Sequence, residues 1–256
     1  MNQTHYAPFI PLVAVVAGCA SSGARRVDSQ PAAVADVSAI VNASDRDPAD
    51  KTMDAGRRAT EMLAFLGIRP GQRVAELMAG RGYTAELLAR AVGKNGRVYG
   101  QNNRFVLERF AARPWADRLA KPPLANVVRL DRELEDPFGA EVSGLDLVVI
   151  NLFYHDAIWF GTDRRAMNAA VLRALRPGGH YVVIDHSARP GAGGSVAKTL
   201  HRVEESLVRD EVLGVGFELV ESSDFVRHAD DSRDWNALDG EKRGTTDRFA
   251  LKFRRP

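Results

Sequence analysis

The sequence has little cysteine and no excess of charge of either sign. Its single cysteine, Cys19, allows no disulfide within the chain and no metal site built from cysteines. Lys and Arg number 35 and Asp and Glu number 33, so the formal net charge is +2. This balance gives no general field for nucleic acid, and we expect no nucleic-acid partner. The apolar run from Phe9 to Ala17 is too short to span a bilayer as a helix.

The composition is that of a globular protein. Apolar residues make up 45% of the 256 residues and charged residues 27%, which are ordinary values. They exclude a disordered chain, a fibrous repeat and a polytopic membrane protein. The length allows one domain of about 200 residues with a sizeable core, plus additional segments.

The N-terminus is expected to lie outside the folded part. Its apolar run fits the core of a signal peptide, and Val16-Ala17-Gly18-Cys19 resembles the lipobox of bacterial lipoproteins. We therefore expect a signal peptide over residues 1–18 and a lipid on Cys19. Residues 19–48 are small and polar, which predicts a flexible tether. The chain would then be anchored to a membrane and face the periplasm; without processing of the signal it would be cytoplasmic.

Residues 49–256 are expected to form the folded domain, in which apolar patterns of strand and helix alternate. The expected helices cover 51–66, 84–92, 105–112, 163–175 and 196–213. The expected strands cover 73–77, 96–101, 126–130, 145–151, 180–185, 217–222 and 248–253. This order predicts a Rossmann-like, doubly wound α/β sheet of seven strands. Because no helix separates the last two strands, one strand should be antiparallel in a mostly parallel sheet.

A glycine turn follows the first strand. Gly80 and Gly82 allow the backbone to turn tightly and to approach a ligand at a helix N-terminus. Residues 80–85 also fit a dinucleotide fingerprint. However, Glu76 stands four residues before the first glycine, and the second strand ends in Gln101-Asn102-Asn103 rather than in the acid that binds an NAD ribose. An NADP-dependent oxidoreductase, with Arg104 offered to a 2′-phosphate, is therefore a secondary alternative.

The same segment resembles the first motif of class I S-adenosylmethionine-dependent methyltransferases, which reads E-x-x-x-G-x-G at residues 76–82. The order of further segments, together covering about residues 50–256, matches this family: Val98-Tyr99-Gly100, Leu172 to Ile184, and Gly216 to Leu219. Within the class, the chain resembles a poorly characterised group of predicted bacterial methyltransferases. That likeness lies in the 45–85 region and in Tyr154-His155-Asp156, Asp185-His186-Ser187 and Leu200-His201-Arg202.

The resemblance implies that S-adenosylmethionine is the cofactor. Glu76, Gly80 and Gly82 would line its methionine and ribose, Asn102 would bind the ribose, and Asp131 would bind the adenine amino group. The remaining expected cofactor residues are Ala79, Tyr83 and Asn151. Two positions depart from the family, which usually has glycine where Met78 stands and a carboxylate where Asn102 stands.

Polar residues follow the fourth and fifth strands, at the edge where such sheets bind ligands. Methyl transfer to a protic acceptor requires removal of a proton, which suits a histidine. His155 is the first choice for the base and His186 the second, with His201 orienting either one and Asp156 beside them. A divalent metal is the less favoured variant, with Asp156, Asp185 and His186 as candidate ligands.

The sequence thus favours a methyltransferase that uses S-adenosylmethionine, acts on a small-molecule acceptor and removes a proton with the help of histidine. The first alternative is a non-catalytic, methyltransferase-like binding protein tethered to a membrane. Met78, Asn102 and the export signal favour this alternative, because the cofactor is not expected outside the cytoplasm.

Overall fold

The computed structural model describes residues 1–4, 33–242 and 244–256. The chain divides into two units, residues 1–31 and 32–256, and the fold below is that of the second unit. Most of the expected signal peptide, Cys19 and the first part of the expected tether lie outside the described residues.

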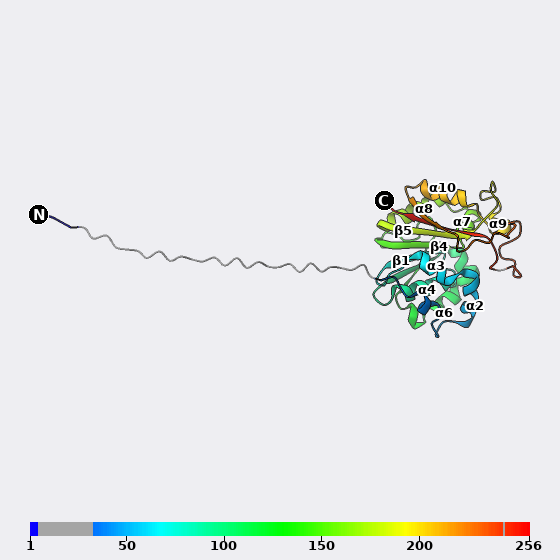
Figure 1. Cartoon of the computed structure of the whole chain (residues 1–256), viewed down its shortest axis with the longest axis horizontal. Coiled ribbons are helices and arrows are strands. Elements are labelled where there is room, and N and C mark those ends of the chain that lie inside the picture. Colours follow the sequence, from blue (N-terminus) through cyan, green and yellow to red (C-terminus); the bar gives the residue numbers. More distant parts are fainter. Residues whose placement is uncertain (5–32, 243) are drawn as a thin grey trace. The chain divides into compact units, whose positions relative to one another are not determined.

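A seven-stranded sheet forms the centre of the second unit (Figure 1). Its strands are β1 (Arg73–Leu77), β2 (Arg97–Asn102), β3 (Val127–Asp131), β4 (Leu145–Asn151), β5 (Leu175–His186), β6 (Glu218–Ser223) and β7 (Arg248–Arg254). They are ordered β3-β2-β1-β4-β5-β7-β6. Strands β1 to β5 pair in parallel, whereas β7 is antiparallel to both β5 and β6. The predicted fold class is confirmed.

Helices cover both faces of this sheet. They are α1 (Val37–Val41), α2 (Pro48–Arg57), α3 (Ala59–Leu66), α4 (Tyr83–Val92), α5 (Arg104–Val106), α6 (Ala112–Leu119), α7 (Tyr154–Trp159), α8 (Arg164–Ala174), α9 (Ala197–Leu200) and α10 (Glu205–Leu213). A π-helical turn, Leu107–Ala111, joins α5 to α6. Side chains of successive strand residues point to opposite faces. Accordingly, Val149 packs in a core with α3 and α4, and Val148 packs in a second core with α6, α8 and α10.

Two predicted helices are interrupted at residues with left-handed backbone. The pattern over 51–66 is divided between α2 and α3 at Arg58, whose φ is +52°. The prediction of one continuous helix over 196–213 is wrong, because the chain leaves the helical conformation between α9 and α10. There His201 has a φ of +51°. The next residue, Arg202, is fully buried and forms an ion pair with Asp231 at 2.7 Å. This tertiary contact outweighs the local helical preference of the segment.

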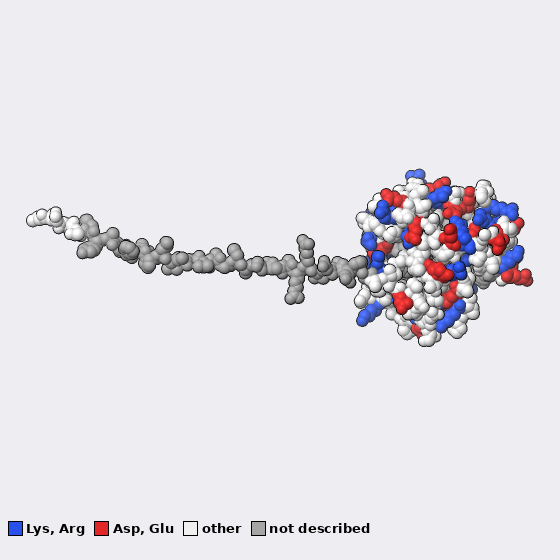
Figure 2. All heavy atoms as spheres, viewed as in Figure 1, with Lys and Arg blue, Asp and Glu red and all other residues white. Residues whose placement is uncertain are grey.

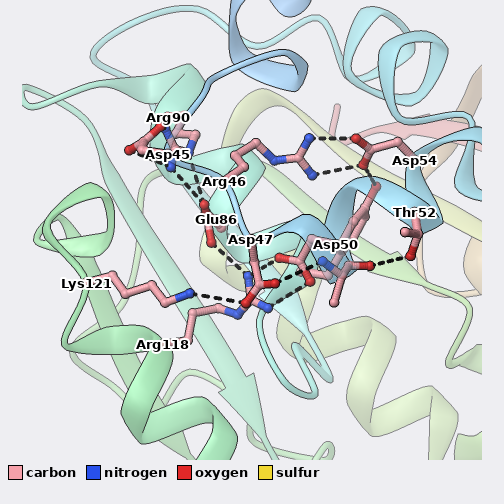
Figure 3. A network of polar contacts seen from close by, with 12 residues as sticks. Asp45, Arg46, Asp47, Asp50, Thr52, Asp54, Glu86, Arg90, Arg118 and Lys121 are labelled. Atoms are coloured by element: carbon pink, nitrogen blue, oxygen red, sulfur yellow. Dashed lines mark hydrogen bonds and ion pairs between the residues drawn. The ribbon is translucent and has the colours of Figure 1, made fainter.

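Residues 37–48 belong to the fold, and this corrects the C-terminal end of the predicted tether. Figure 3 shows the charged network that holds this segment. Arg46 is buried and pairs with Asp54 at 2.7 Å, while Arg90 of α4 binds Asp45 at 2.9 Å. Arg118 of α6 pairs with the buried Asp50. Because a buried charge is stable only when it is paired, these contacts fix the segment to α4 and α6.

The surface carries charges of both signs, as the sequence predicts. Figure 2 shows Lys and Arg interspersed with Asp and Glu on the face in view. Among the described residues, none of the helices is both long and apolar enough to cross a bilayer.

Candidate functional site

Three residues of the turn after β1 have left-handed backbone. Their φ angles are +54° at Met78, +57° at Gly80 and +87° at Gly82. The Met78 N–H donates to the Gln101 side chain at 3.0 Å, and the Ala79 N–H donates to the Gln101 carbonyl at 2.8 Å. Met78 therefore adopts a left-handed conformation that favours glycine, the residue that the resembling methyltransferases usually have at this position. This conformation costs a residue with a side chain about 1–2 kcal/mol.

Asn102 braces this turn from inside the protein. Its Oδ1 accepts from the Gly80 N–H at 2.7 Å, and its Nδ2 donates to the Gly80 carbonyl at 3.0 Å. The side chain is fully buried. Both polar atoms thus already have a partner on the turn, and the predicted ribose contact stays a prediction.

Trp115 of α6 fills the space beside Gly82. A Cβ added to Gly82 would lie 2.2 Å from the indole ring, and one added to Gly100 of β2 would lie 2.7 Å from it. The ring is fully buried and cannot move aside. Packing therefore requires glycine at position 82, independently of any contact that this residue makes with a ligand. Gly80 differs, because its added Cβ would lie 3.7 Å from the Phe153 ring, which is an ordinary contact.

Glu76 is a buried carboxyl at the end of β1. Its Oε2 has no hydrogen-bond partner among the described residues. Burial raises the pKa of Glu76 to about 7, although a hydrogen bond from Thr84 and the charge of Arg57 oppose this rise. Buried polar atoms are seldom left without a partner. The orphaned oxygen therefore fits a ligand that brings an ammonium or hydroxyl group to the turn.

The other predicted cofactor residues divide into two groups. Asp131 ends β3 beside Asn102 of β2, and its partly exposed carboxylate binds Arg129 at 2.7 Å. Tyr83 and Asn151 instead make internal contacts. The Tyr83 hydroxyl donates to Asp54 at 2.6 Å, and the Asn151 amide donates to the Thr84 hydroxyl at 3.3 Å. The structure therefore gathers Glu76, Ala79, Gly80, Gly82 and Asn102 at the turn, with Asp131 on the next strand end.

The predicted histidines meet at the carboxyl ends of β4 and β5. His155 of α7 is buried, and its Nδ1 lies 2.7 Å from Oδ1 of the fully buried Asp185. The His201 Nδ1 lies 3.3 Å from the other ring nitrogen, Nε2 of His155. The interruption between α9 and α10 is what places His201 there.

The two buried histidines carry opposite pKa shifts. Burial disfavours a charged His155, but Asp185 and Asp156 outweigh burial and raise its pKa. Burial and the charge of His155 hold the pKa of His186 well below its usual range. His186 also has its Nδ1 bound to the Thr246 hydroxyl at 2.8 Å. The second-choice base is thus a neutral, hydrogen-bonded residue. The sequence gives no signal for Thr246.

The ligand set expected for a metal, Asp156, Asp185 and His186, is not the one that the structure brings together. Among the described residues, the group of ligand atoms close enough to hold an ion is that of His155, Asp156 and His201. Asp185 is occupied by His155 and by the backbone N–H of His186 at 2.7 Å.

Aromatic side chains lie beside these groups. Trp159 donates its Nε1–H to Asp156 at 2.6 Å. Its ring centroid is 5.7 Å from that of Phe105, which follows the end of β2 and is partly exposed. An aromatic wall thus links the edges of β2 and β4. A cavity of about 420 Å³, lined by Thr162, Arg164 and Glu211 among others, contains none of the predicted site residues.

Comparison with solved structures gives the fold. The crystal structure of a SAM-dependent methyltransferase from Aquifex aeolicus matches with a TM-score of 0.60 and 16% identity, covering 82% of this chain and 94% of that one. The cyclase SpnF matches with a TM-score of 0.54 and 17% identity, covering 78% and 82%. No protein-family model and no curated protein matches the sequence. The chain therefore has the fold that the Aquifex aeolicus methyltransferase shares with the cyclase SpnF, and one fold can support different chemistry.

Proposed function

We propose that the chain is a methyltransferase that uses S-adenosylmethionine and acts on a small-molecule acceptor. The observation that carries this proposal is the left-handed turn at Met78, Gly80 and Gly82, which opens at the same sheet edge as the imidazoles of His155 and His201. In an open α/β sheet, ligands bind outside the carboxyl ends of the strands. A cofactor on the turn and an acceptor at the imidazoles would then be neighbours.

The residues at the turn suit the cofactor's polar groups. Glu76 offers a buried, unpartnered carboxylate oxygen, which an ammonium group would satisfy. The backbone at Gly80 is left without a side chain, so that a ligand can approach closely. When bound, the cofactor supplies an electrophilic methyl group. The protein has to align the acceptor with that methyl and to exclude water.

The finer part of the proposal is that the acceptor loses its proton at the histidines. Asp185 accepts the Nδ1–H of His155, so that in the neutral ring Nε2 carries the lone pair and faces His201. His155 is deeply buried, whereas His201 is partly exposed and can meet an acceptor. A lone pair at this place can take a proton itself, or it can bind a cation that acidifies the acceptor.

Binding and transfer of a labelled methyl group test the proposal. We expect S-adenosylmethionine and S-adenosylhomocysteine to raise the melting temperature of the full chain, whereas NADP should leave it unchanged. Gly80→Ala should lower the affinity for both nucleosides at least about 10-fold, because its methyl group would occupy space that the ligand needs for close approach to the backbone.

Gly67→Ala is the matched control. Gly67 follows the end of α3, has a left-handed φ of +66° and has no atom within 4 Å of an added Cβ. It thus introduces the same backbone strain away from the turn, and it should leave nucleoside affinity unchanged. Stabilisation by NADP alone, or equal affinity in the wild type and Gly80→Ala, would overturn the proposed cofactor site.

A binding protein without transferase activity is the second candidate. It is favoured by Asn102, which stands where the family has a carboxylate and is bound to Gly80 on both sides. S-adenosylhomocysteine binding without turnover on a broad panel of acceptors would support it. Arg104 does not support the oxidoreductase alternative, because its guanidinium is paired with Glu108 at 2.6 Å.

We also propose that Cys19 carries a lipid that anchors the chain in a membrane. The support is the lipobox-like Val16-Ala17-Gly18-Cys19 in the sequence. Labelling cells with a fatty acid should mark the wild type but not Cys19→Ala. Equal labelling of both proteins would refute the anchor.

A further inference from the structure

Three ligand-type atoms form a nearly equilateral triangle at the carboxyl end of β4. They are Nε2 of His155, Oδ1 of Asp156 and Nδ1 of His201. His155 Nε2 lies 3.3 Å from Asp156 Oδ1 and 3.3 Å from His201 Nδ1, and the third edge, His201 Nδ1 to Asp156 Oδ1, measures 3.4 Å. The side chains come from the first turn of α7 and from the residue that ends α9.

The two edges that join nitrogen to oxygen are longer than ordinary hydrogen bonds between these atoms, which measure about 2.7–3.2 Å. They agree with the distance between two ligands of one tetrahedral ion. Nitrogen and oxygen atoms at about 2.0–2.1 Å from Zn²⁺ lie about 3.3–3.4 Å apart when the geometry is tetrahedral. An octahedral Mg²⁺ site would bring neighbouring ligands to about 3.0 Å and would use more oxygen atoms.

The contacts behind the triangle prepare its atoms for an ion. Asp185 accepts the Nδ1–H of His155 at 2.7 Å, so that Nε2 is the nitrogen that loses its proton and carries the lone pair when an ion binds. Its second oxygen accepts the backbone N–H of His155 at 2.8 Å. Trp159 donates to Asp156 at 2.6 Å and fixes the carboxylate. Carboxylates behind ligating histidines orient the ring and make it a better ligand.

His201 is held in place against a local cost. Its φ of +51° is unfavourable for a residue with a side chain. The neighbouring Arg202 keeps it there, because its fully buried guanidinium pairs with Asp231 at 2.7 Å and donates to the Ser187 carbonyl at 3.0 Å. Strain that the surrounding structure imposes points to function at that residue.

We propose that His155, Asp156 and His201 bind one divalent ion of the zinc class, with the fourth tetrahedral position open. Two imidazoles and one carboxylate match the donor preference of such an ion. The binding of this ion does not depend on the proposed methyl transfer. What occupies the open position rests on the proposed function: an oxygen, nitrogen or sulfur atom of the acceptor would bind there and become more acidic. His155 and His201 would then be ligands, and neither would take the proton itself.

Cobalt provides the test, since tetrahedral Co²⁺ absorbs visible light strongly and octahedral Co²⁺ does not. The full chain, freed of metal by a chelator and without S-adenosylmethionine, is titrated with Co²⁺ and, by calorimetry, with Zn²⁺. We expect one ion per chain and the strong absorption of a tetrahedral site. His201→Gly removes one ligand while suiting the left-handed backbone, and it should weaken binding at least about 100-fold.

Two further variants complete the experiment. Asp185→Asn should weaken binding about 10- to 100-fold, because it removes the carboxylate behind His155. His180→Asn is the control, since His180 pairs with Leu147 in the first half of β4, away from the triangle, and the substitution should leave binding unchanged. Circular dichroism of each metal-free variant verifies folding. If the wild type gives no tetrahedral absorption, or if the folded His201→Gly binds like the wild type, the site is refuted. A chain that binds the ion but not S-adenosylmethionine would refute the proposed function alone.

Discussion

The turn after β1 and the histidine edge of β4 and β5 differ in where their polar groups point. At the turn, Asn102 and Gln101 form hydrogen bonds with the backbone of Gly80, Met78 and Ala79. At the histidine edge, three side chains direct ligand atoms toward one another. Residues that resemble a family motif can thus build the framework, whereas the side chains for which we propose a chemical role lie in the second region.

The largest effect is expected from Gly82→Ala at the turn. Its Cβ would lie 2.2 Å from Trp115, and its φ of +87° disfavours a side chain. We expect the free energy of unfolding to fall by about 3–5 kcal/mol. Gly80→Ala, which meets only an ordinary contact, should cost about 1 kcal/mol. Denaturant titration of both variants measures the difference in the free energy of unfolding. Equal losses would contradict the conclusion that packing requires glycine at position 82 but not at position 80.

Glu76 makes the stability of the turn depend on pH. Its pKa is raised from 4.5 in the unfolded chain to about 7 in the fold. The protonated carboxyl is therefore stabilised by folding below about pH 4.5, and that contribution is lost as the pH rises through 7. Between about pH 5 and pH 8.5 the wild type should lose about 2–3 kcal/mol more than Glu76→Gln. Parallel pH profiles of the two proteins would show that this carboxyl ionises normally.

The smallest effect is expected at the histidine edge, and its sign is opposite. His201→Gly relieves a left-handed residue and should raise the free energy of unfolding by about 1 kcal/mol in the absence of metal. Its methyl-transfer activity should nevertheless fall about 100-fold or more. Thermal unfolding and turnover are measured on the same preparation. A variant that is less stable than the wild type would show that His201 serves packing rather than the site.

Much of the framework could be predicted from the sequence. The apolar runs locate all seven strands within a few residues, and the missing helix between the last two strands predicts one antiparallel strand, which in the structure is β7. The positions of His155 and His186 at one edge follow from their places after parallel strands, since these ends share that edge. Local patterns and strand order were sufficient for these features.

The remaining features depend on contacts between distant residues. The helical pattern over 196–213 is real, yet the burial of Arg202 against Asp231 interrupts it. Asn102 resembles a ribose-binding residue by position, but its amide reaches Gly80, 22 residues away in sequence. Likewise, Thr246 reaches His186 across 60 residues. Such pairings leave no periodic pattern in the sequence. For the same reason, the tether predicted from the sequence extends too far toward the C-terminus.

The ion pairs of Asp45 and Arg46 have a practical consequence for anyone who shortens this chain. A fragment that begins at residue 49 would lack both residues, leaving Asp54 without its guanidinium partner and Arg90 without Asp45. Arg90 and Arg118 share the carboxylate of Glu86, and Arg118 lies beside Gly82. Such a truncation would therefore disturb the side chains that pack against the turn after β1, whereas a start at residue 33 would preserve these contacts.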